Sequence, residues 1–520
     1  MTQSNIHKDT EIGNNSGYTQ SLWMEVEVPT FAPLMEDITA DVCIVGAGIV
    51  GLTCAYTLAK QGKSVVVLDQ GAIGGGQTAR TTAHLSWILE SRYFEFEKMF
   101  GEEAARQIAE SHSAAIDYIE KIVREEKIDC DFERLDGYLF TAPEDSHDTL
   151  DKEFNAIKKT GMEVSKSEKA PFNSSVDTGP CLQFPRQGQF HILKYLQGLI
   201  KAILKLGGKL FSYSHVNHIE DGSPCHVKTA AGAKVTAQSI IVATCSPIND
   251  RLIMHTKQAA YRTYVIAATI PRGSVPKGLY WDTADPYHYV RLQNNLKDPN
   301  LEWLIIGGED HKTGQDLEIN EKYDHLEKWA RERFSMIQKI DHRWSGQVFE
   351  SMDGIAFIGR NPTNNHLYIS TGDTGNGMTH GTIAGILVSD LIFGKNNPWK
   401  DLYDPSRKTI SAASEFIEEN LNALAQLKDW FTPGETTKVE ALAPEEGVVL
   451  REGLKKIAVY KDKDNKVHIN SAICPHLGGC LRWNKGEKSW DCPLHGSRFD
   501  GCGKVITGPS MCHLHGESVN

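Results

Sequence analysis

The chain has 520 residues and a formal net charge of −12. That length is enough for two or three domains, and the acidic balance argues against a nucleic-acid partner. The polar N-terminus carries no apolar signal core, so we expect a cytoplasmic protein with a loose N-terminal tail and no transmembrane segment. The eleven cysteines are scattered along the chain, unlike those of a secreted disulfide scaffold.

Residues 1–37 form an extension ahead of the first strong pattern. Their apolar stretch, SLWMEVEVPTFAPL, is expected to lie across the body of the protein. The segment 41–69 then opens with a short apolar run, Val42–Val45, which predicts a buried strand. A glycine-rich turn and a helical pattern follow. Val65–Leu68 predicts a second strand, apolar on both faces as in a parallel sheet.

The turn after the first strand has the spacing G-x-G-x-x-G. Gly46 permits a tight turn, Gly48 lets a pyrophosphate approach the backbone, and Gly51 lets the helix pack close to the strand. Free N–H groups at the helix start face the phosphates, and Asp69 can accept hydrogen bonds from a ribose diol. These features predict a dinucleotide site. The alternative is a membrane span over the uncharged residues 42–59, but the glycines and polar flanks favour a soluble βαβ unit.

A glycine-rich loop follows the second strand, GAIGGGQTARTTAHLSW. It contains Thr78, Arg80, Thr81 and Thr82, which suit a loop that wraps the phosphates of a cofactor and leads towards its reactive ring. The alternative interpretation is a flexible surface loop.

The next segments alternate between helix and strand. Residues 97–127 are predicted to be an amphipathic helical region, and residues 137–145 a strand and turn. The segment 188–216 reads as a helix followed by a strand, and SIIVATCSP forms a further apolar strand with Thr244 at its tip. We interpret these last two as a second part of the nucleotide-binding sheet, to which the chain returns after an insertion.

Residues 260–345 alternate apolar and polar side chains and predict an antiparallel sheet. The first domain is then completed by a long apolar helix, Thr382–Phe393. Gly372, Gly375 and Gly377 precede this helix, so its N-terminus can face an electron-rich ring edge.

The glycine run, the ARTTA loop, the IVAT strand and the helix start STGDTGNGMTHG together resemble the FAD-dependent amine and amino-acid oxidoreductases of the D-amino-acid oxidase superfamily. The resemblance covers residues 38–400. It implies an α/β FAD-binding Rossmann-like domain (38–96, 186–259, 346–400) with an inserted antiparallel-sheet substrate domain (97–185, 260–345). The residues it places at FAD are Gly46, Gly48, Gly51, Asp69, Thr78, Arg80, Thr81, Thr82, Ala83, Val216, Thr244, Gly372, Gly375, Gly377 and Met378.

Within that set, the resemblance places Thr78–Ala83 near the pyrophosphate and flavin, Val216 and Thr244 on the adenine side, and Gly372–Met378 at the flavin carbonyl edge.

One departure from the family pattern concerns Asp69, because the family usually has Glu there and Asp is commoner in NAD sites. The N-terminal placement and the distant return segments still favour FAD. Relatives with covalent flavin carry a His near Arg80, and we expect non-covalent FAD.

The C-terminal part begins with a predicted connector, residues 401–438, in which an amphipathic helix ends at Trp430 before a Pro-Gly turn. Short strand patterns follow from residue 439. Cys474 and His476 form C-x-H, and Cys492 and His495 form C-x-x-H. Two thiolates and two imidazoles on two loops can bind zinc or a 2Fe–2S cluster of the Rieske type, in which one iron takes both Cys and the other both His.

The run WNKGEKSWDCPLHGSRFD and the G-x-V-x-x-G-P that follows resemble the all-β Rieske fold. The resemblance implies a 2Fe–2S cluster bound by the four metal ligands just named. Respiratory Rieske proteins have a further Cys in each loop; here Gly479 and Leu494 take those places and Cys480 is displaced by one, so no disulfide is expected. We treat Cys502 and Cys512 as ordinary thiols.

Two positions bear on the redox potential. The resemblance implies that the Ser497 hydroxyl donates a hydrogen bond to a bridging sulfide, which raises the potential, and that Phe499 stands where a donating Tyr is often found. We expect a potential in the middle or lower part of the Rieske range of about −150 to +300 mV.

Joining a flavin and a cluster in one chain raises the effective concentration of one beside the other. We therefore predict a dehydrogenase that oxidises a small amine or amino acid at the flavin and passes electrons singly to an external acceptor, ferredoxin or quinone-linked.

In relatives a Tyr and an Arg often bind the substrate carboxylate. Tyr289 and Arg291 alternate onto one strand face and are candidates, with Arg supplying a bidentate fork. His84 is a candidate near the ring. The alternative for these three residues is ordinary core packing.

Two other functions remain open at this point. In one, a ferredoxin reduces the cluster, which reduces the flavin and then a substrate. In the other, the chain is a non-enzymatic relay or redox sensor whose flavin pocket takes no small substrate.

Overall fold

The structure is a computed structural model. It describes residues 16–142, 145, 148–172, 175–249, 252–316, 319–408, 420–422, 425–426, 428, 439–453 and 455–517. The predicted connector helix ending at Trp430 lies mostly outside these residues.

An eight-stranded sheet forms the centre of the first domain. Its strands are β1 (Ile38–Val45), β2 (Val65–Leu68), β7 (Lys209–Phe211), β8 (Val216–Glu220), β9 (Cys225–Thr229), β10 (Lys234–Val242), β16 (Phe357–Arg360) and β17 (Leu367–Thr371). The order is β16-β17-β10-β1-β2-β7, with β9 and β8 joined through β10. β1 pairs in parallel with both β2 and β10. All four residues of β2 are buried, as a central parallel strand requires.

A nine-stranded sheet forms the second body. Its strands are β3 (His84–Leu85), β4 (Glu133–Phe140), β5 (Ser165–Ser167), β6 (Cys181–Gln189), β11 (Gln258–Pro271), β12 (Leu279–Asp282), β13 (Tyr289–Asn294), β14 (Leu301–Lys312) and β15 (Lys339–Ser351). β14 pairs antiparallel with β11 and with β13, as the alternating pattern predicts. The two predicted insertions thus share one sheet, because β12 pairs with β4.

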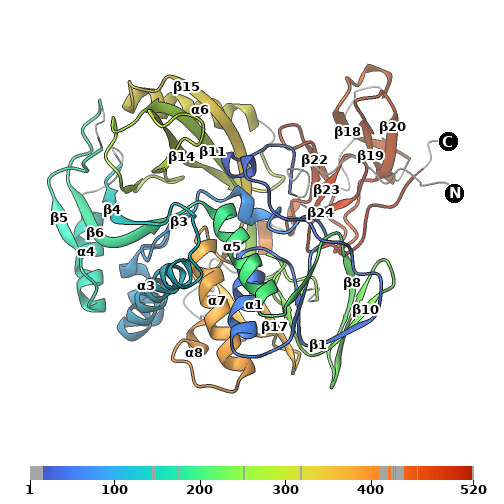
Figure 1. Ribbon diagram of the computed structural model, residues 1–520. Coiled ribbons are helices and arrows are strands. Elements are labelled where there is room, and N and C mark those ends of the chain that lie inside the picture. Colours follow the sequence, from blue (N-terminus) through green and yellow to red (C-terminus); the bar gives the residue numbers. More distant parts are fainter. Residues whose placement is uncertain are drawn as a thin grey trace.

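The helices are α1 (Ile49–Lys60), α2 (Tyr93–Phe100), α3 (Glu102–Glu125), α4 (Asp148–Thr160), α5 (Ile192–Lys205), α6 (Ile319–Arg333), α7 (Gly377–Ile392) and α8 (Lys400–Tyr403), with short 3-10 turns η2 (Leu22–Glu25), η3 (Gln77–Arg80) and η6 (Val439–Ala441). α1 packs against α5 and α7 beside the first sheet (Figure 1). No helix in the described part of the chain has the length and apolar character needed to cross a bilayer.

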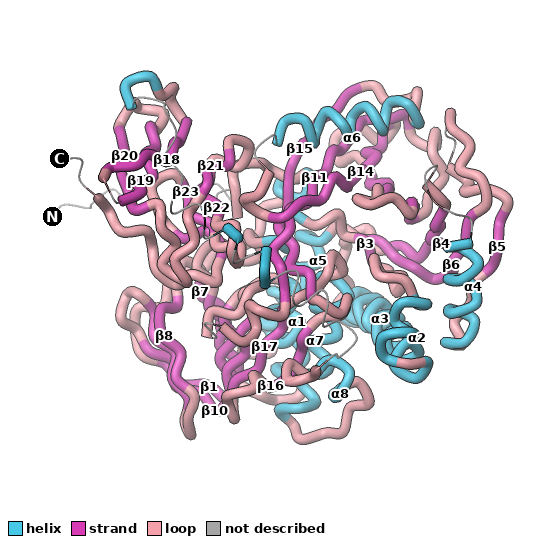
Figure 2. The backbone as a smooth tube through the Cα atoms, turned by 180° about the vertical axis from the view of Figure 1, so that it is seen from behind, coloured by secondary structure: helices cyan, strands magenta, loops and turns pink. Residues whose placement is uncertain are grey.

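The C-terminal domain is all β. It contains a three-stranded sheet, β18 (Glu446–Glu452), β19 (Lys455–Lys461) and β20 (Val467–Ser471), and a four-stranded sheet, β21 (Arg482–Asn484), β22 (Ser489–Asp491), β23 (Arg498–Asp500) and β24 (Val505–Thr507). Figures 1 and 2 show this domain beside the end of β11 and β15, above β8 and β10. The predicted fold class is confirmed: an α/β domain with an inserted sheet, and a C-terminal all-β domain.

Two local predictions differ from the structure. α6 lies within the segment predicted to be all strand, although Ile319, Tyr323, Leu326 and Ala330 carry a helical spacing and pack into the core of the second sheet. α7 begins at Gly377, five residues before the predicted start, so this glycine belongs to the helix itself.

Candidate active site and iron–sulfur centre

The turn between β1 and α1 has the close approaches that the glycine spacing predicts. Gly46 has a φ of +103°, and a Cβ there would lie 2.4 Å from the Ala243 carbonyl oxygen. A Cβ at Gly51 would lie 1.9 Å from the Gly46 carbonyl oxygen, so only glycine lets α1 start this close to β1. Gly48 precedes α1 without a side-chain cap. The Ile49 N–H donates to the Thr78 hydroxyl at 3.1 Å, and the other N–H groups of the first turn are left for phosphate oxygens.

Asp69 directly follows β2 and stabilises this turn. Its Oδ2 accepts a hydrogen bond from the Ala47 N–H at 2.8 Å, and its Oδ1 accepts one from the Gly71 N–H at 2.9 Å. Burial raises the pKa of this carboxyl, while the two N–H groups oppose the rise. The Asp69 side chain, shorter than the Glu usual in the family, therefore bonds to the backbone. Each of its carboxylate oxygens keeps one further acceptor position for a ribose hydroxyl.

A cavity runs along the C-terminal edge of the first sheet and on to the second sheet. Its volume is about 280 Å³. The predicted FAD residues that line it are Gly46, Gly48, Asp69, Thr78, Arg80, Thr81, Thr82, Val216, Thr244, Gly375, Gly377 and Met378. Gly51, Ala83 and Gly372 are not part of the lining. The glycine cradle and a lining that reaches from the first sheet to the second fit FAD.

Arg80 lines the cavity, but its positive charge is paired with a carboxylate of the C-terminal domain. Its guanidinium forms an ion pair with Glu487 of the C-terminal domain at 3.4 Å, and both side chains are buried. It also donates to the Ser16 hydroxyl and to the carbonyl oxygen of Ser345. Thr19, in the N-terminal extension, donates to Glu487 as well. Arg80 is therefore a junction between the two domains and the extension.

The expectation that Arg291 binds a substrate carboxylate needs correction. Arg291 is fully buried, is not part of the cavity lining, and donates to the carbonyl oxygens of Thr82, Ala83 and Phe190. Ala83 has a φ of +58°, uncommon for a residue with a Cβ. Arg291 thus supports the strained flavin loop from behind. The strand alternation identified its face correctly but not the loop that covers it.

Tyr289 and His84 both line the cavity. Their rings meet edge to face with centroids 5.7 Å apart. Burial, and then the charge of Arg291, lower the pKa of His84 to about 3, so the imidazole is neutral at neutral pH. The Tyr289 hydroxyl lies 2.7 Å from the Thr263 hydroxyl, which fixes the ring against the second sheet.

Two carboxyl groups in the cavity were not predicted. Glu90 lies between β3 and α2, and Asp310 lies on β14; both line the cavity together with Trp281 and Tyr287. The pairing of β11 with β14 shifts register at Thr263, and such a bulge re-aims side chains near a site. No local sequence signal marks either carboxyl, because each becomes part of the site only through the long-range packing of the sheet.

The four predicted metal ligands lie on two loops of matching design. Cys474 and His476 lie between β20 and β21, and Cys492 and His495 between β22 and β23. Each loop is closed by a hydrogen bond back to its cysteine carbonyl, from Gly478 N–H and from Gly496 N–H, both 3.0 Å long. Both glycines have positive φ, +77° and +74°, a conformation that a side chain disfavours.

The donor set fits a 2Fe–2S cluster. Both cysteines are about 2% exposed, and the His476 and His495 rings lie 5.2 Å apart between centroids. The Nδ1 atom of His495 is buried without a hydrogen-bond partner, as expected for a nitrogen that binds metal. None of the eleven cysteines forms a disulfide bond, Cys480, Cys502 and Cys512 included.

Ser497 and Phe499 are the two residues expected to influence the redox potential of the cluster. The Ser497 hydroxyl oxygen accepts a hydrogen bond from the Ser510 N–H at 3.0 Å, so its own proton is left to donate, and it bonds to the Cys474 sulfur. Phe499 is fully buried and has no hydroxyl to donate.

The imidazole side of the cluster site faces the flavin-binding part of the molecule. The His255 ring lies 4.8 Å from that of His476 and 5.8 Å from that of His495, centroid to centroid. Gln347 lines the cavity, and its side-chain amide donates to the Gly496 carbonyl oxygen at 2.8 Å. One side chain therefore separates the cavity from a ligand loop.

The C-terminal domain also closes the far end of the cavity. Ile506, Thr507, Gly508, Ser510 and Met511 belong to the lining. The Gln70 side chain donates to the Ile506 carbonyl oxygen at 2.6 Å, and His215 Nε2 lies 2.9 Å from the Met511 carbonyl oxygen. A dinucleotide in this cavity would be covered by the C-terminal domain.

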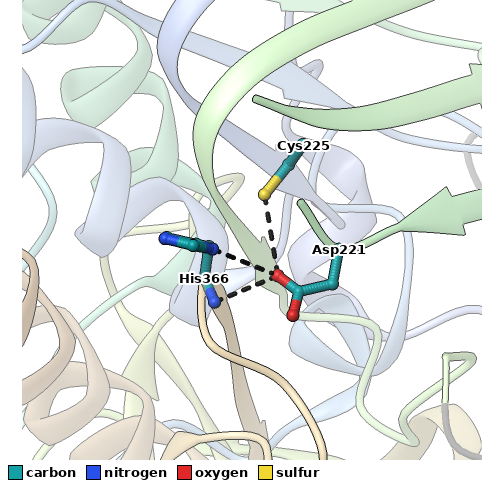
Figure 3. Close-up of side chains that lie close together, drawn as sticks. All are labelled: Asp221, Cys225 and His366. Carbon is teal, nitrogen blue, oxygen red and sulfur yellow. Dashed lines mark hydrogen bonds and ion pairs between the residues drawn. The ribbon is translucent and has the colours of Figure 1, made fainter. Parts of the chain in front are cut away.

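A separate group of metal-type ligands lies at the edge of the first sheet (Figure 3). Asp221, Cys225 and His366 offer ligand atoms within 4.8 Å of one another. The Asp221 carboxylate, however, accepts the backbone N–H groups of Asn365 and His366 at 2.8 and 3.1 Å, and the Cys225 thiol donates to the Gly222 carbonyl oxygen at 3.1 Å. These hydrogen bonds link the turn at Asp221 to the turn at Asn365, so the group has a structural role.

A dinucleotide cavity joined to a Cys₂His₂ pair of loops defines a flavoprotein oxidoreductase with an iron–sulfur domain. Residues 41–391 match the family model of the FAD dependent oxidoreductases, and residues 430–516 match that of the Rieske [2Fe-2S] domain. The chain belongs to the FAD-dependent oxidoreductase family and carries a C-terminal Rieske domain. Its cofactors are FAD and a Rieske 2Fe–2S cluster, as predicted.

Individual proteins agree with this assignment. The chain is 32% identical to the "Putative Rieske 2Fe-2S iron-sulfur protein YhfW" of Bacillus subtilis, over 93% of this chain and 94% of the relative. It is 27% identical to gamma-glutamylputrescine oxidoreductase of Escherichia coli, over 70% of this chain and 86% of that protein. The crystal structure of glycine oxidase from Geobacillus kaustophilus shares the fold, with a TM-score of 0.60 at 19% identity over 71% of this chain and 99% of that one.

Proposed function

We propose that the enzyme is a dehydrogenase that oxidises a small amine or amino acid at the flavin and passes the electrons one at a time through the Rieske cluster to an external acceptor. FAD accepts two electrons as a hydride, and a 2Fe–2S cluster transfers one electron at a time. The similarity to gamma-glutamylputrescine oxidoreductase supports a C–N bond as the site of oxidation.

The observation that carries the proposal is the contact between Gln347 and Gly496. Gln347 lines the cavity and donates to the carbonyl oxygen of the residue that follows the cluster ligand His495. The ligand loop also packs on β11, because a Cβ at Gly496 would lie 2.4 Å from the Ala260 Cβ. This arrangement holds the cluster-binding loop against the cavity that fits FAD.

The chain's own residues have three roles in this proposal. The N–H groups at the start of α1 bind the pyrophosphate. Tyr289, fixed by Thr263, and neutral His84 enclose the substrate at the second sheet. The segment Ile506–Met511 of the Rieske domain covers the cavity and excludes water from the cofactor.

Anaerobic mixing of the holoenzyme with a panel of amines and amino acids tests this function. The expected result is bleaching of the visible flavin band by at least one compound, followed by reduction of the cluster and then of an added ferredoxin or quinone. The proposal fails if no compound bleaches the flavin while reduced ferredoxin reduces the cluster and then the flavin, since electrons would then flow in the opposite direction.

A further inference from the structure

The substrate end of the cavity contains a pair of carboxyl groups that the proposed function does not use. Glu90 and Asp310 both line the cavity. Asp310 bonds to the Thr263 hydroxyl through one oxygen, while its Oδ1 atom is buried with no hydrogen-bond partner. A buried carboxylate oxygen left without a donor costs free energy unless a ligand supplies one.

Glu90 lies at the point where the cavity meets the loop before α7. A Cβ built on Gly375 would lie 3.2 Å from Glu90 Oε2 and 3.6 Å from the Tyr287 hydroxyl. The family resemblance places this loop at the flavin edge. Glu90 and Tyr287 are therefore positioned where a substrate carbon would approach the ring.

Aromatic rings form the walls beside the two carboxyls. The Tyr287 and Tyr289 centroids lie 5.3 Å apart, and the His84 ring lies edge-on to both Tyr289 and Trp281, at 5.7 and 6.5 Å. Electron-rich ring faces next to carboxylates attract organic cations.

Few positively charged side chains line the cavity to neutralise Glu90 and Asp310. Among the described residues, Arg80 and Arg92 are the only Arg or Lys side chains in the lining. Arg80 is paired with Glu487. Arg92 lies close enough to lower the pKa of both Glu90 and the buried Glu153, so its charge is shared between two carboxyls. Its Nη1 atom has no hydrogen-bond partner, so of the two arginines among the described lining residues Arg92 is the one better placed to bind a carboxylate.

The balance of nearby charges is acidic. Burial and then the charge of Asp310 raise the pKa of Glu90 to about 8. Burial raises the pKa of Asp310 to about 7; Glu309 and Asp285 add to the rise, and His288 opposes it. A cation placed between the two carboxyls would relieve both this repulsion and the cost of desolvation.

We infer that the cavity selects a cationic amine rather than an α-amino acid, with the substrate ammonium group held by Glu90 and Asp310 and its carbon chain enclosed by Trp281, Tyr287 and Tyr289. The inference rests on the proposed function and names its substrate class. Glu90 takes one proton from the ammonium group. Bound FAD would supply the two-electron acceptor for the hydride from the C–H bond next to the neutral nitrogen, and water would hydrolyse the iminium product to a carbonyl compound and ammonia or a smaller amine.

Binding of unreactive probes to the oxidised holoenzyme tests the inference without turnover. tert-Butylammonium, tert-butanol and pivalate have nearly the same shape but carry positive, zero and negative charge, and the ammonium probe has no C–H bond on the carbon that bears nitrogen. Each is titrated at pH 8.5 while the visible flavin spectrum is followed. We expect tert-butylammonium to bind about 10-fold to 100-fold more tightly than tert-butanol, as one or two charge-assisted hydrogen bonds would give, and pivalate to bind least.

Two variants and one matched control sharpen the test. Glu90→Gln and Asp310→Asn should each weaken tert-butylammonium binding by about tenfold or more while leaving tert-butanol binding unchanged. Asp285→Asn removes an exposed acid from the same region and should change either affinity less than about threefold, because its field is screened by water. Retention of the flavin spectrum shows that each variant is folded.

Tighter binding of pivalate than of tert-butylammonium would overturn the inference, as would unchanged affinity for the ammonium probe in both carboxyl variants. These outcomes are distinct from failure of the proposed function. Cation binding with no electron transfer to the cluster would contradict the proposed function alone, and pivalate binding with intact electron transfer would contradict the substrate class alone.

Discussion

Arg80 of the flavin-binding domain and Glu487 of the Rieske domain form an ion pair of 3.4 Å, with side chains that are 0% and 1% exposed. Burial alone would raise the pKa of Glu487, but the charges of Arg80, Arg262 and Arg498 lower it to about 2. Removing one member of a buried pair is strongly destabilising because the other charge is left uncompensated. This pair therefore anchors the Rieske domain on the flavin-binding domain.

The first prediction concerns this junction. Glu487→Gln should destabilise the docked Rieske domain by about 3–5 kcal/mol, because the buried arginines Arg80 and Arg262 lose their shared partner. We expect a lower melting temperature, faster limited proteolysis between the domains and slower reduction of the cluster by the flavin. Asp464→Asn, in an exposed turn of the same domain, is the control and should behave as the wild type. Equal proteolysis of the two variants would contradict the structural role of Glu487.

The second prediction separates the two cofactors. Cys492→Ser should abolish the signal of the reduced cluster in electron paramagnetic resonance, because it removes one iron ligand, while the flavin stays bound and still bleaches with substrate. Cys480→Ser provides a matched control, since Cys480 is also a buried thiol in a loop of the same domain. Loss of the cluster in the Cys480 variant as well would mean that the ligand assignment is wrong.

The third prediction concerns the potential of the cluster. Ser497→Ala removes the hydroxyl that bonds to the Cys474 sulfur. A hydrogen bond to a charged group contributes about 1.5–3 kcal/mol, which corresponds to about 60–130 mV for one electron. The bond is present in both oxidation states, so the potential should fall by at most that amount. Phe499→Tyr adds a donor and should raise it. A redox titration measures both shifts, and a wild-type potential above about +200 mV would contradict the expected position within the Rieske range.

The fourth prediction follows from the pKa of Glu90. A carboxyl whose pKa rises from 4.5 in the unfolded chain to about 8 in the folded protein binds its proton more tightly when folded. Its contribution to stability is therefore lost as the pH rises from about 4.5 to 8. Glu90→Gln should stabilise the protein by roughly 1–3 kcal/mol above pH 8 and have little effect near pH 4.5. Melting temperatures across this range, with Asp285→Asn for comparison, check the trend; a stability gain independent of pH would not fit.

The sequence predicted the parts of the site that have local spacing. Gly46, Gly48, Gly51 and the two ligand loops act through backbone geometry and short-range order, so their positions could be read directly. α6 could also have been found from its apolar spacing. The nine-stranded sheet was predicted as antiparallel, but the union of its two insertions depends on the long-range pairing of β4 with β12.

Side-chain roles that depend on distant contacts were not accessible in this way. Arg80 and Arg291 both stand in patterns suited to ligand binding, yet each is used by the fold: one meets Glu487 across the domain junction, and the other holds the flavin loop. Glu90 and Asp310 lie 220 residues apart in the sequence and line the same cavity, where the pairing of β11 with β14 shifts register. The spacing of residues along the sequence does not predict such long-range contacts.

The most direct test of electron transfer from substrate through flavin to cluster is a single turnover under anaerobic conditions, followed by rapid-mixing absorbance and freeze-quench electron paramagnetic resonance. With an amine substrate and no external acceptor, flavin bleaching should come first, and the reduced-cluster signal should then grow as the flavin partly reoxidises. The Cys492→Ser variant should stop after the first step. A flavin that bleaches fully in the wild type while the cluster stays oxidised would contradict the account.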